Sequence, residues 1–139
     1  MTTLLDTHAW IWWIDQDIRL GAANIAALDK LDQFSRPFIA DISLWEVAML
    51  VERGRLNLDI PLEEWLDAAA HPRSVRVQPI TPAIAAEVAA LPSTFHRDPA
   101  DRLIVATCRV LNLPLLTHDR RITRARLVKR WQPSAERPL

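Results

Sequence analysis

The sequence contains a single cysteine, Cys108, so no disulfide can form within the chain. Internal disulfides are typical of oxidising compartments, and their exclusion fits a reducing one. No stretch approaches the roughly 20 apolar residues that span a bilayer, and the N-terminus has no basic region followed by a long apolar run. We therefore expect a soluble, cytoplasmic protein that does not associate with membranes, with Cys108 as a buried thiol.

The sequence also lacks an excess of charge. The 17 Lys and Arg residues balance the 17 Asp and Glu residues, so bulk charge does not indicate a nucleic-acid-binding protein. The basic residues are unevenly distributed, however. Between residues 119 and 139 the only acids are Asp119 and Glu136, whereas the basic residues there are Arg120, Arg121, Arg124, Arg126, Lys129, Arg130 and Arg137.

Length and composition indicate a globular protein. A chain of 139 residues, 50% of them hydrophobic, is long enough to bury a core of its own. No repeat, linker or low-complexity segment divides it, so we expect one domain that spans residues 1–139.

Short apolar runs alternate with longer helical patterns along the chain. Strands are expected at residues 2–5, 37–42, 75–80 and 113–117, with 126–131 as a candidate edge strand. Helices are expected at residues 7–14 with Thr7 as a candidate N-cap, 22–31, 43–56 with an end near Gly54, 61–71 with Pro61 as first residue, 82–91 and from 99 onwards. This alternation predicts an α/β fold with a parallel sheet covered on both faces.

Four acidic residues stand where an expected strand ends or an expected helix begins. Asp6 ends the first strand, and Asp119 follows the strand at 113–117. Glu46 and Asp101 lie in the first turns of two helices. Because the carboxyl ends of parallel strands share one edge, where α/β proteins bind ligands, these side chains are expected to converge.

Convergence of carboxylates requires a counterion. Two carboxylates about 4 Å apart repel by roughly 4 kcal/mol at an effective dielectric constant of about 20. Oxygen-only ligands suit a hard divalent ion, Mg²⁺ or Mn²⁺, which activates water and neutralises charge on a phosphoryl oxygen. The pattern therefore predicts metal-dependent phosphodiester hydrolysis.

Each acid also has a purely structural interpretation. Ser43 and Glu46 form a capping-box pattern, and Asp98 precedes Pro99 as an N-cap, with Asp101 two residues further on. Asp6 and Asp119 are candidate caps of the turns that follow them. Capping alone does not explain why all these acids lie at one edge of the expected sheet. An N-cap side chain turns back to its own helix, so we favour Asp98 as a cap or secondary site residue and Asp101 as a metal ligand.

Four segments occur in an order and spacing that resemble the PIN-domain family, in particular the ribonuclease toxins of VapBC toxin–antitoxin modules. These segments are "LLDTHAWIWW", "SLWEVAMLVERGRLNL", "DPADRLIVATC" and "PLLTHD". The resemblance covers nearly the whole chain. It implies a three-layer α/β/α domain with a central, mostly parallel sheet, an acidic Mg²⁺ or Mn²⁺ site, and cleavage of RNA.

The resemblance also implies roles for single residues and partners. Asp6, Glu46 and Asp101 match acids that hold the metal directly or through water, Asp119 matches the last acid, and Asp98 is a secondary candidate. Thr117 matches a hydroxyl that orients water or a neighbouring acid. The implied partners are an RNA substrate, a cognate VapB-type antitoxin and a second copy of the chain in a homodimer.

Other readings stay open. Three histidines near the acids, His8, His96 and His118, suggest an alternative His/Asp metal site, although solvated loop histidines fit their spacing better. The first helix is rich in tryptophan, which indicates core packing or an interface. Candidate contacts to RNA phosphates are Arg102, Arg120, Arg121, Arg124 and Arg126. A catalytically silent PIN-fold binding module and a DNA-directed nuclease remain alternatives, whereas the signatures of aspartate-based phosphatases and receiver domains are missing.

Overall fold

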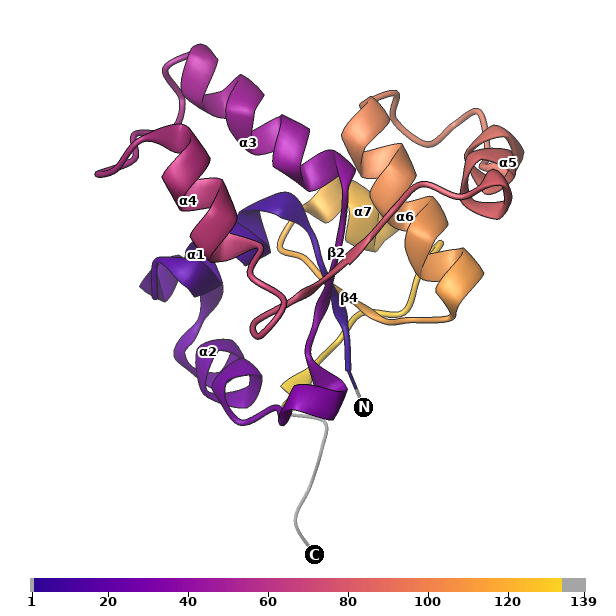
Figure 1. Cartoon of the computed structure of the whole chain (residues 1–139). Coiled ribbons are helices and arrows are strands. Elements are labelled where there is room, and N and C mark those ends of the chain that lie inside the picture. Colours follow the sequence, from indigo (N-terminus) through magenta and orange to yellow (C-terminus); the bar gives the residue numbers. More distant parts are fainter. Residues whose placement is uncertain (1, 134–139) are drawn as a thin grey trace, which may run out of the picture.

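The computed structural model describes residues 2–133, and strands and helices alternate along them as predicted (Figure 1). The strands are β1 (Leu4–Leu5), β2 (Phe38–Ala40), β3 (Arg76–Gln78) and β4 (Leu115–Leu116). The α-helices are α1 (Thr7–Ile14), α2 (Ala22–Asp29), α3 (Ile42–Glu52), α4 (Leu62–Ala69), α5 (Pro82–Ala90), α6 (Pro99–Leu111) and α7 (Arg120–Ala125). Two 3-10 helices, η1 (Ile18–Leu20) and η2 (Gln33–Ser35), lie between β1 and β2.

The four strands form one parallel sheet in the order β3-β2-β1-β4. Leu4 of β1 pairs with Phe38 of β2 on one side and with Leu115 of β4 on the other. All four carboxyl ends therefore lie at one edge of the sheet, and β4 is an outer strand.

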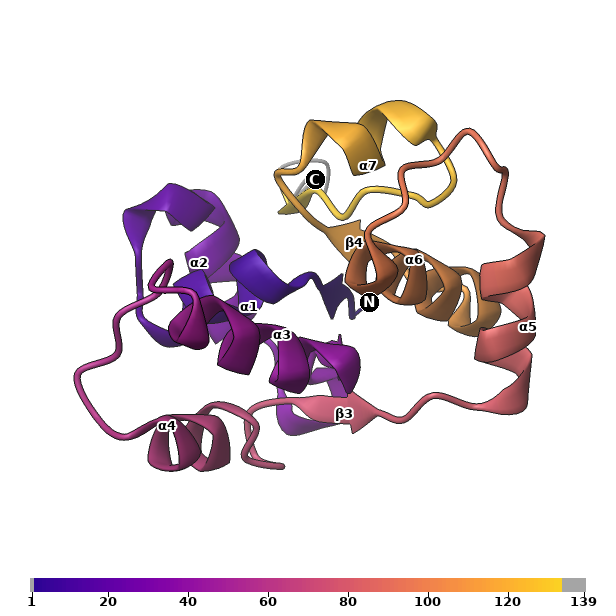
Figure 2. The same ribbon diagram turned by 90° about the horizontal axis from the view of Figure 1, so that it is seen from above.

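Helices cover both faces of this sheet. Figure 2 shows α1 to α4 on one side of the strands and α5 to α7 on the other. Successive residues of a strand point to opposite faces. Leu5, Ile39 and Leu116 accordingly belong to one hydrophobic core, and the core on the other face contains Leu4, Ala40 and Leu115. The predicted three-layer α/β/α architecture is confirmed.

The tryptophans of the first core pack as expected for a buried helix. The indole of Trp10 is fully buried and donates a hydrogen bond from Nε1 to the carbonyl of Ala69 at 3.0 Å. Its ring meets that of Trp65 edge to face at 5.3 Å between centroids. Trp45 of α3 lies outside this core, and half of its surface is exposed. Cys108 is buried in the second core, as predicted.

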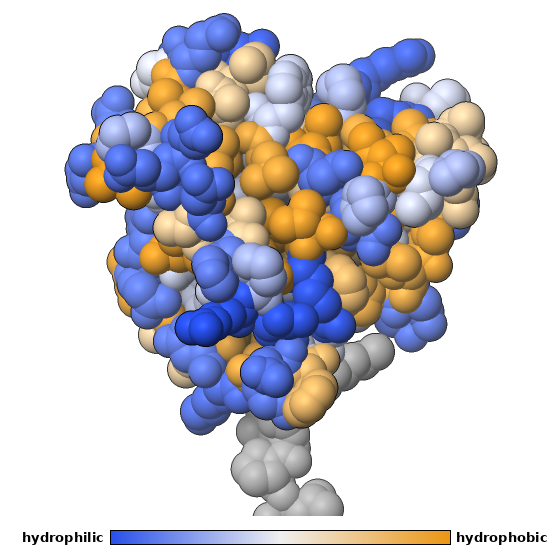
Figure 3. Space-filling view, in the orientation of Figure 1, coloured by the Kyte–Doolittle hydropathy of each residue, from blue (hydrophilic) through white to orange (hydrophobic). Residues whose placement is uncertain are grey.

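The remaining surface mixes residue types. On the face drawn in Figure 3, hydrophobic residues gather in the upper part of the view and hydrophilic residues predominate in the lower part. Within residues 2–133, no helix has both the length and the apolar character needed to cross a membrane.

Several details of the predicted elements are wrong. The segment 126–131 forms only an isolated bridge, Leu115 to Arg130, in place of an edge strand. Pro61 occupies the N-cap of α4, because its ψ of 146° is extended and outside the helical range. Asp6, not Thr7, is the N-cap of α1. By contrast, α3 ends at Glu52, and Gly54 follows with a φ of +71°, as expected for a glycine that closes a helix.

Candidate active site

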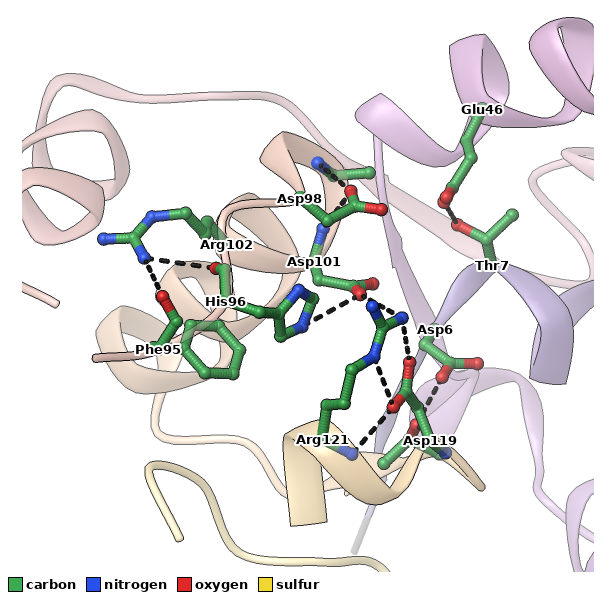
Figure 4. A network of polar contacts seen from close by, with 12 residues as sticks. Asp6, Thr7, Glu46, Phe95, His96, Asp98, Asp101, Arg102, Asp119 and Arg121 are labelled. Atoms are coloured by element: carbon green, nitrogen blue, oxygen red, sulfur yellow. Dashed lines mark hydrogen bonds and ion pairs between the residues drawn. The ribbon is translucent and has the colours of Figure 1, made fainter. Parts of the chain in front are cut away.

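The acidic residues highlighted by the sequence gather around the carboxyl edge of the sheet (Figure 4). Asp6 directly follows β1, and Asp119 directly precedes α7 after β4. Glu46 projects from α3, and Asp101 lies in the first turn of α6. The fold thus brings side chains from four separate segments to one side of the molecule.

Asp6 is buried and acts as a cap and as part of the cluster at once. Its Oδ1 accepts a hydrogen bond from the backbone amide of Ala9 at 2.8 Å, which caps α1. Its Oδ2 accepts a hydrogen bond from the Thr117 hydroxyl. Burial raises the pKa of Asp6, and these two bonds partly oppose the rise.

Thr117 links two acids of the cluster. Its hydroxyl donates to Asp6 and accepts a hydrogen bond from the backbone amide of Asp119 at 3.0 Å. The side chain is almost completely buried, so water does not compete for these bonds. Thr117 therefore fixes the Asp6 carboxylate relative to the start of α7.

Glu46 is held by a neighbouring helix instead of by a capping box. The helix α3 begins one residue earlier than predicted, with Asp41 at the N-cap position, so Ser43 lies inside the helix. The hydroxyl of Ser43 instead contacts the Thr7 hydroxyl at 2.9 Å, and Thr7 donates to Glu46 Oε1. The predicted capping box is wrong, and Glu46 points across to α1.

Thr7 and Ser43 are site residues that the sequence reasoning missed. Burial raises the pKa of Glu46, the bond from Thr7 lowers it, and the charges of Asp98 and Asp6 raise it again. The available signal was a hydroxyl residue directly after Asp6 and another one helical turn before Glu46.

Asp98 of "DPAD" caps α6 as predicted, whereas the side chain of Asp101 contacts other segments. Asp98 Oδ1 accepts hydrogen bonds from the amides of Ala100 at 2.9 Å and Asp101 at 3.3 Å, with Pro99 as the first residue of α6. Asp101 turns away from its own helix. Its Oδ2 lies 3.2 Å from His96 Nε2 and 3.7 Å from Arg121 Nη2.

Asp101 is the acid most affected by its surroundings. Burial raises its pKa to about 7, and the charges of Asp98, Glu46, Asp119 and Asp6 contribute to the rise in that order. The guanidinium of Arg121 lies beside it and does not cancel this effect. The four other acids are therefore close enough to act on Asp101 electrostatically.

Asp119 is in the opposite electrostatic situation. Burial acts to raise its pKa, but hydrogen bonds from Arg121 outweigh burial and lower it. The side chain of Arg121 donates to Asp119 Oδ2 at 2.9 Å, and the Arg121 amide donates to Oδ1 at 2.8 Å. Asp119 thus caps α7 as an ionised group.

The histidines differ in their exposure. His8 and His118 are exposed. The ring of His96 packs against that of Phe95, with 4.6 Å between the ring centroids, and lies beside Asp101. Burial and then the charge of Arg121 lower the pKa of His96. The expectation of a solvated loop histidine is wrong for His96, because Arg102 ties its loop to α6.

Arg102 ties down the loop with its guanidinium group. Its Nη1 donates to the carbonyls of Phe95 at 3.0 Å and His96 at 3.3 Å. Its donors are therefore engaged with the protein backbone and are less available to RNA phosphates than predicted.

The acids surround a common region without a tight ligand cage. Within residues 2–133, no group of three or more His, Cys, Asp or Glu side chains is arranged so that it could hold one ion. This applies to the carboxylates and equally to the alternative His/Asp site. Hydrogen bonds from Thr117, Thr7 and Arg121 hold Asp6, Glu46 and Asp119 in separate positions.

A parallel sheet with acids from several segments at its carboxyl edge defines the class of α/β proteins to which the PIN fold belongs. The family model "PIN domain" matches residues 3–127, and the chain belongs to this family.

Two known proteins extend this finding. The chain is 43% identical over 121 residues to "Ribonuclease VapC22" of Mycobacterium tuberculosis (strain ATCC 25618 / H37Rv), a match that covers 87% of this chain and 89% of the relative. A chain of a "Toxin-antitoxin complex from Klebsiella pneumoniae" has a similar fold, with a TM-score of 0.65 and 20% identity. That match covers 95% of this chain and 98% of the other chain.

Proposed function

We propose that the protein is a metal-dependent endoribonuclease that acts as the toxin of a toxin–antitoxin pair. The observation that carries the proposal is the cluster of Asp6, Glu46, Asp101 and Asp119 at the carboxyl edge of the sheet. The identity of 43% to a ribonuclease over most of both chains supports the choice of RNA as substrate.

The donor set fits a hard divalent ion such as Mg²⁺ or Mn²⁺. All candidate ligands are carboxylate oxygens, and burial followed by mutual repulsion raises the pKa of Asp101 and Glu46. Mg²⁺ keeps several of its waters, so a loose arrangement of acids is compatible with binding through water. Asp6, Glu46 and Asp101 would hold the ion directly or through water, and Asp119 would complete the site or hold a second ion.

When bound, the ion would supply Lewis acidity and lower the pKa of a water nucleophile. The chain's own residues position these groups. Thr117 fixes the plane of the Asp6 carboxylate, and Thr7 holds Glu46. Arg121 places a guanidinium beside Asp101, where it pairs with a phosphate oxygen of the substrate.

The partner and oligomer assignments follow from the same proposal. We propose a cognate VapB-type antitoxin as partner and a cytoplasmic location, in line with the identity of 43% to a VapC ribonuclease. The homodimer stays a prediction, which light scattering on the purified protein would test.

A metal-dependence assay on RNA tests the function. The wild-type protein is expected to cleave single-stranded RNA in the presence of Mg²⁺ or Mn²⁺, and cleavage is expected to stop when EDTA is added. Asp6→Asn and Asp101→Asn should lower the rate at least about 100-fold, the upper end of losses seen when groups that only orient metal ligands are removed. Asp67→Asn, at an exposed position of α4, is the matched control.

The same assay separates the alternatives. Cleavage of single-stranded DNA in preference to RNA would favour the DNA-directed nuclease. Binding of RNA without cleavage at any metal concentration would favour the silent binding module. Activity retained by folded Asp6→Asn and Asp101→Asn variants would refute the proposed roles of these two acids.

A further inference from the structure

Much of the basic charge near the C-terminus is not used by the acid cluster. Arg121 is engaged with Asp119 and Asp101. The remaining cations of this region include Arg124, Arg126 and Lys129, which are exposed. In the part of the chain that the structure describes, no carboxylate lies within ion-pair distance of these three side chains.

Two grooves run past these cations. The first has a volume of about 350 Å³ and is lined by His96 and Arg121, both of which contact Asp101 of the acid cluster. It continues past Arg124 to Leu127. The second has a volume of about 620 Å³, is also lined by Leu127, and continues past Arg126, Lys129 and Arg130. Because one residue lines both grooves, they adjoin each other.

The fold places these cations along one edge of the sheet, next to the acids. The helix α7 begins at the carboxyl edge of the sheet, directly after Asp119. The segment after it returns along the outer strand β4, where Lys129 and Trp131 hydrogen-bond to both sides of Leu115 at 2.8 and 2.9 Å. The cations therefore lie along the outer edge of the sheet, where the chain at Arg130 runs parallel to β4 and the Arg130 guanidinium lies 3.4 Å from the ring of His118.

We propose that the two grooves form one binding path, here named the basic track, for single-stranded RNA that flanks the cleaved phosphodiester. This inference rests on the proposed ribonuclease function. The track begins at Arg121, beside the acids where the reacting phosphate must lie. Beyond the acids, the exposed cations Arg124, Arg126 and Lys129 take up successive phosphates, which release their counterions.

The chemistry of the track favours a single strand over the alternatives. Grooves that follow a nucleic-acid backbone with cations are typical of single-strand binding, whereas duplex RNA is recognised by its shape across the minor groove. An acidic segment of an antitoxin is a different occupant with similar charge. Position beside the acid cluster favours RNA, because the phosphodiester to be cleaved must lie at the acids and the strand that flanks it must leave along a neighbouring surface.

The test uses the full chain with Arg124→Gln and Lys129→Gln combined. The control combines Arg53→Gln and Arg55→Gln, which remove the same charge from exposed positions after α3. Affinity for a labelled 12-nucleotide single-stranded RNA is measured by fluorescence anisotropy in EDTA over a range of salt concentrations. Binding is thereby measured independently of cleavage.

Two lost phosphate contacts should reduce the slope of log affinity against log salt by about 1.4. Between 50 and 200 mM salt the wild type then loses about sevenfold more affinity than the track variant, and the control behaves like the wild type. In cleavage assays, the ratio of wild-type to variant kcat/KM should grow with RNA length.

Other results would overturn the basic track. Equal slopes for the wild type and the track variant would refute it, as would loss of binding to an acidic antitoxin segment with unchanged RNA affinity. If the wild type cleaves no RNA while the slopes differ as expected, the nuclease proposal fails and the binding path stands.

Discussion

The substitution Asp101→Asn is expected to make the metal-free protein more stable at alkaline pH while it abolishes cleavage. The native carboxyl group has a pKa of about 7, against an ordinary value of 3.8. Protonation of the native state is therefore favoured over protonation of the unfolded chain. This stability is fully present below about pH 4 and is lost as the pH rises through about 7.

The magnitude follows from the size of the change. Each tenfold change in acidity corresponds to about 1.4 kcal/mol, so the rise of the Asp101 pKa corresponds to about 4 kcal/mol. An asparagine has nearly the same shape and no charge at any pH. At pH 8 the free energy of unfolding of Asp101→Asn should exceed that of the wild type by up to about 4 kcal/mol, and near pH 4 by almost nothing.

Urea unfolding in EDTA at pH 4, 6 and 8 measures this difference. The control is Asp67→Asn at an exposed position, whose free energy of unfolding should stay within about 0.5 kcal/mol of that of the wild type. Addition of Mn²⁺ at pH 8 should raise the midpoint of the wild type and leave that of Asp101→Asn nearly unchanged. A variant that is less stable than the wild type at pH 8, or a gain that does not grow with pH, would refute the reasoning.

Three further substitutions or treatments test other parts of the site. Asp98→Ala should cost about 1 kcal/mol of unfolding free energy through loss of the α6 cap, and Asp98→Ser should restore it. Thr7→Val should weaken Mn²⁺ binding about 10-fold or more in calorimetry because Glu46 loses its positioning hydrogen bond, and unchanged affinity would contradict this. Cys108 is buried and its pKa is raised, so a maleimide should label it at pH 8 only after denaturant is added; rapid labelling of the native protein would contradict the packing of the second core.

The layers of the fold and most of the acids could be predicted because their signals are local. Asp98 as N-cap and Pro99 as first residue fix the start of α6. The apolar residues that follow give the helix its buried face. Strand positions were also evident, although the strands are shorter than their apolar patterns. β3 ends at Gln78 because Pro79 has no amide to donate to a neighbouring strand.

The contacts around the acids could not be predicted because they join distant segments. Thr7 meets Ser43 and Glu46 across 36 and 39 residues, and Asp101 meets Arg121 from a different helix. No local pattern states that Ser43 faces α1 instead of its own helix start. The segment 126–131 shows the converse error, since its apolar residues suggested an edge strand but only Arg130 forms a bridge.

The capping and site interpretations of the acids are compatible, and a pair of substitutions separates them. Asp6, Asp98 and Asp119 each cap a helix, so three helix N-termini with their partial positive charge meet at the acid cluster. This charge offsets part of the repulsion among the carboxylates. At Asp6, asparagine keeps the cap and removes the charge, whereas alanine removes both. Asp6→Asn should therefore remain folded without activity, and Asp6→Ala should in addition lose about 1 kcal/mol of stability. A stable and active Asp6→Asn would leave Asp6 with a structural role alone.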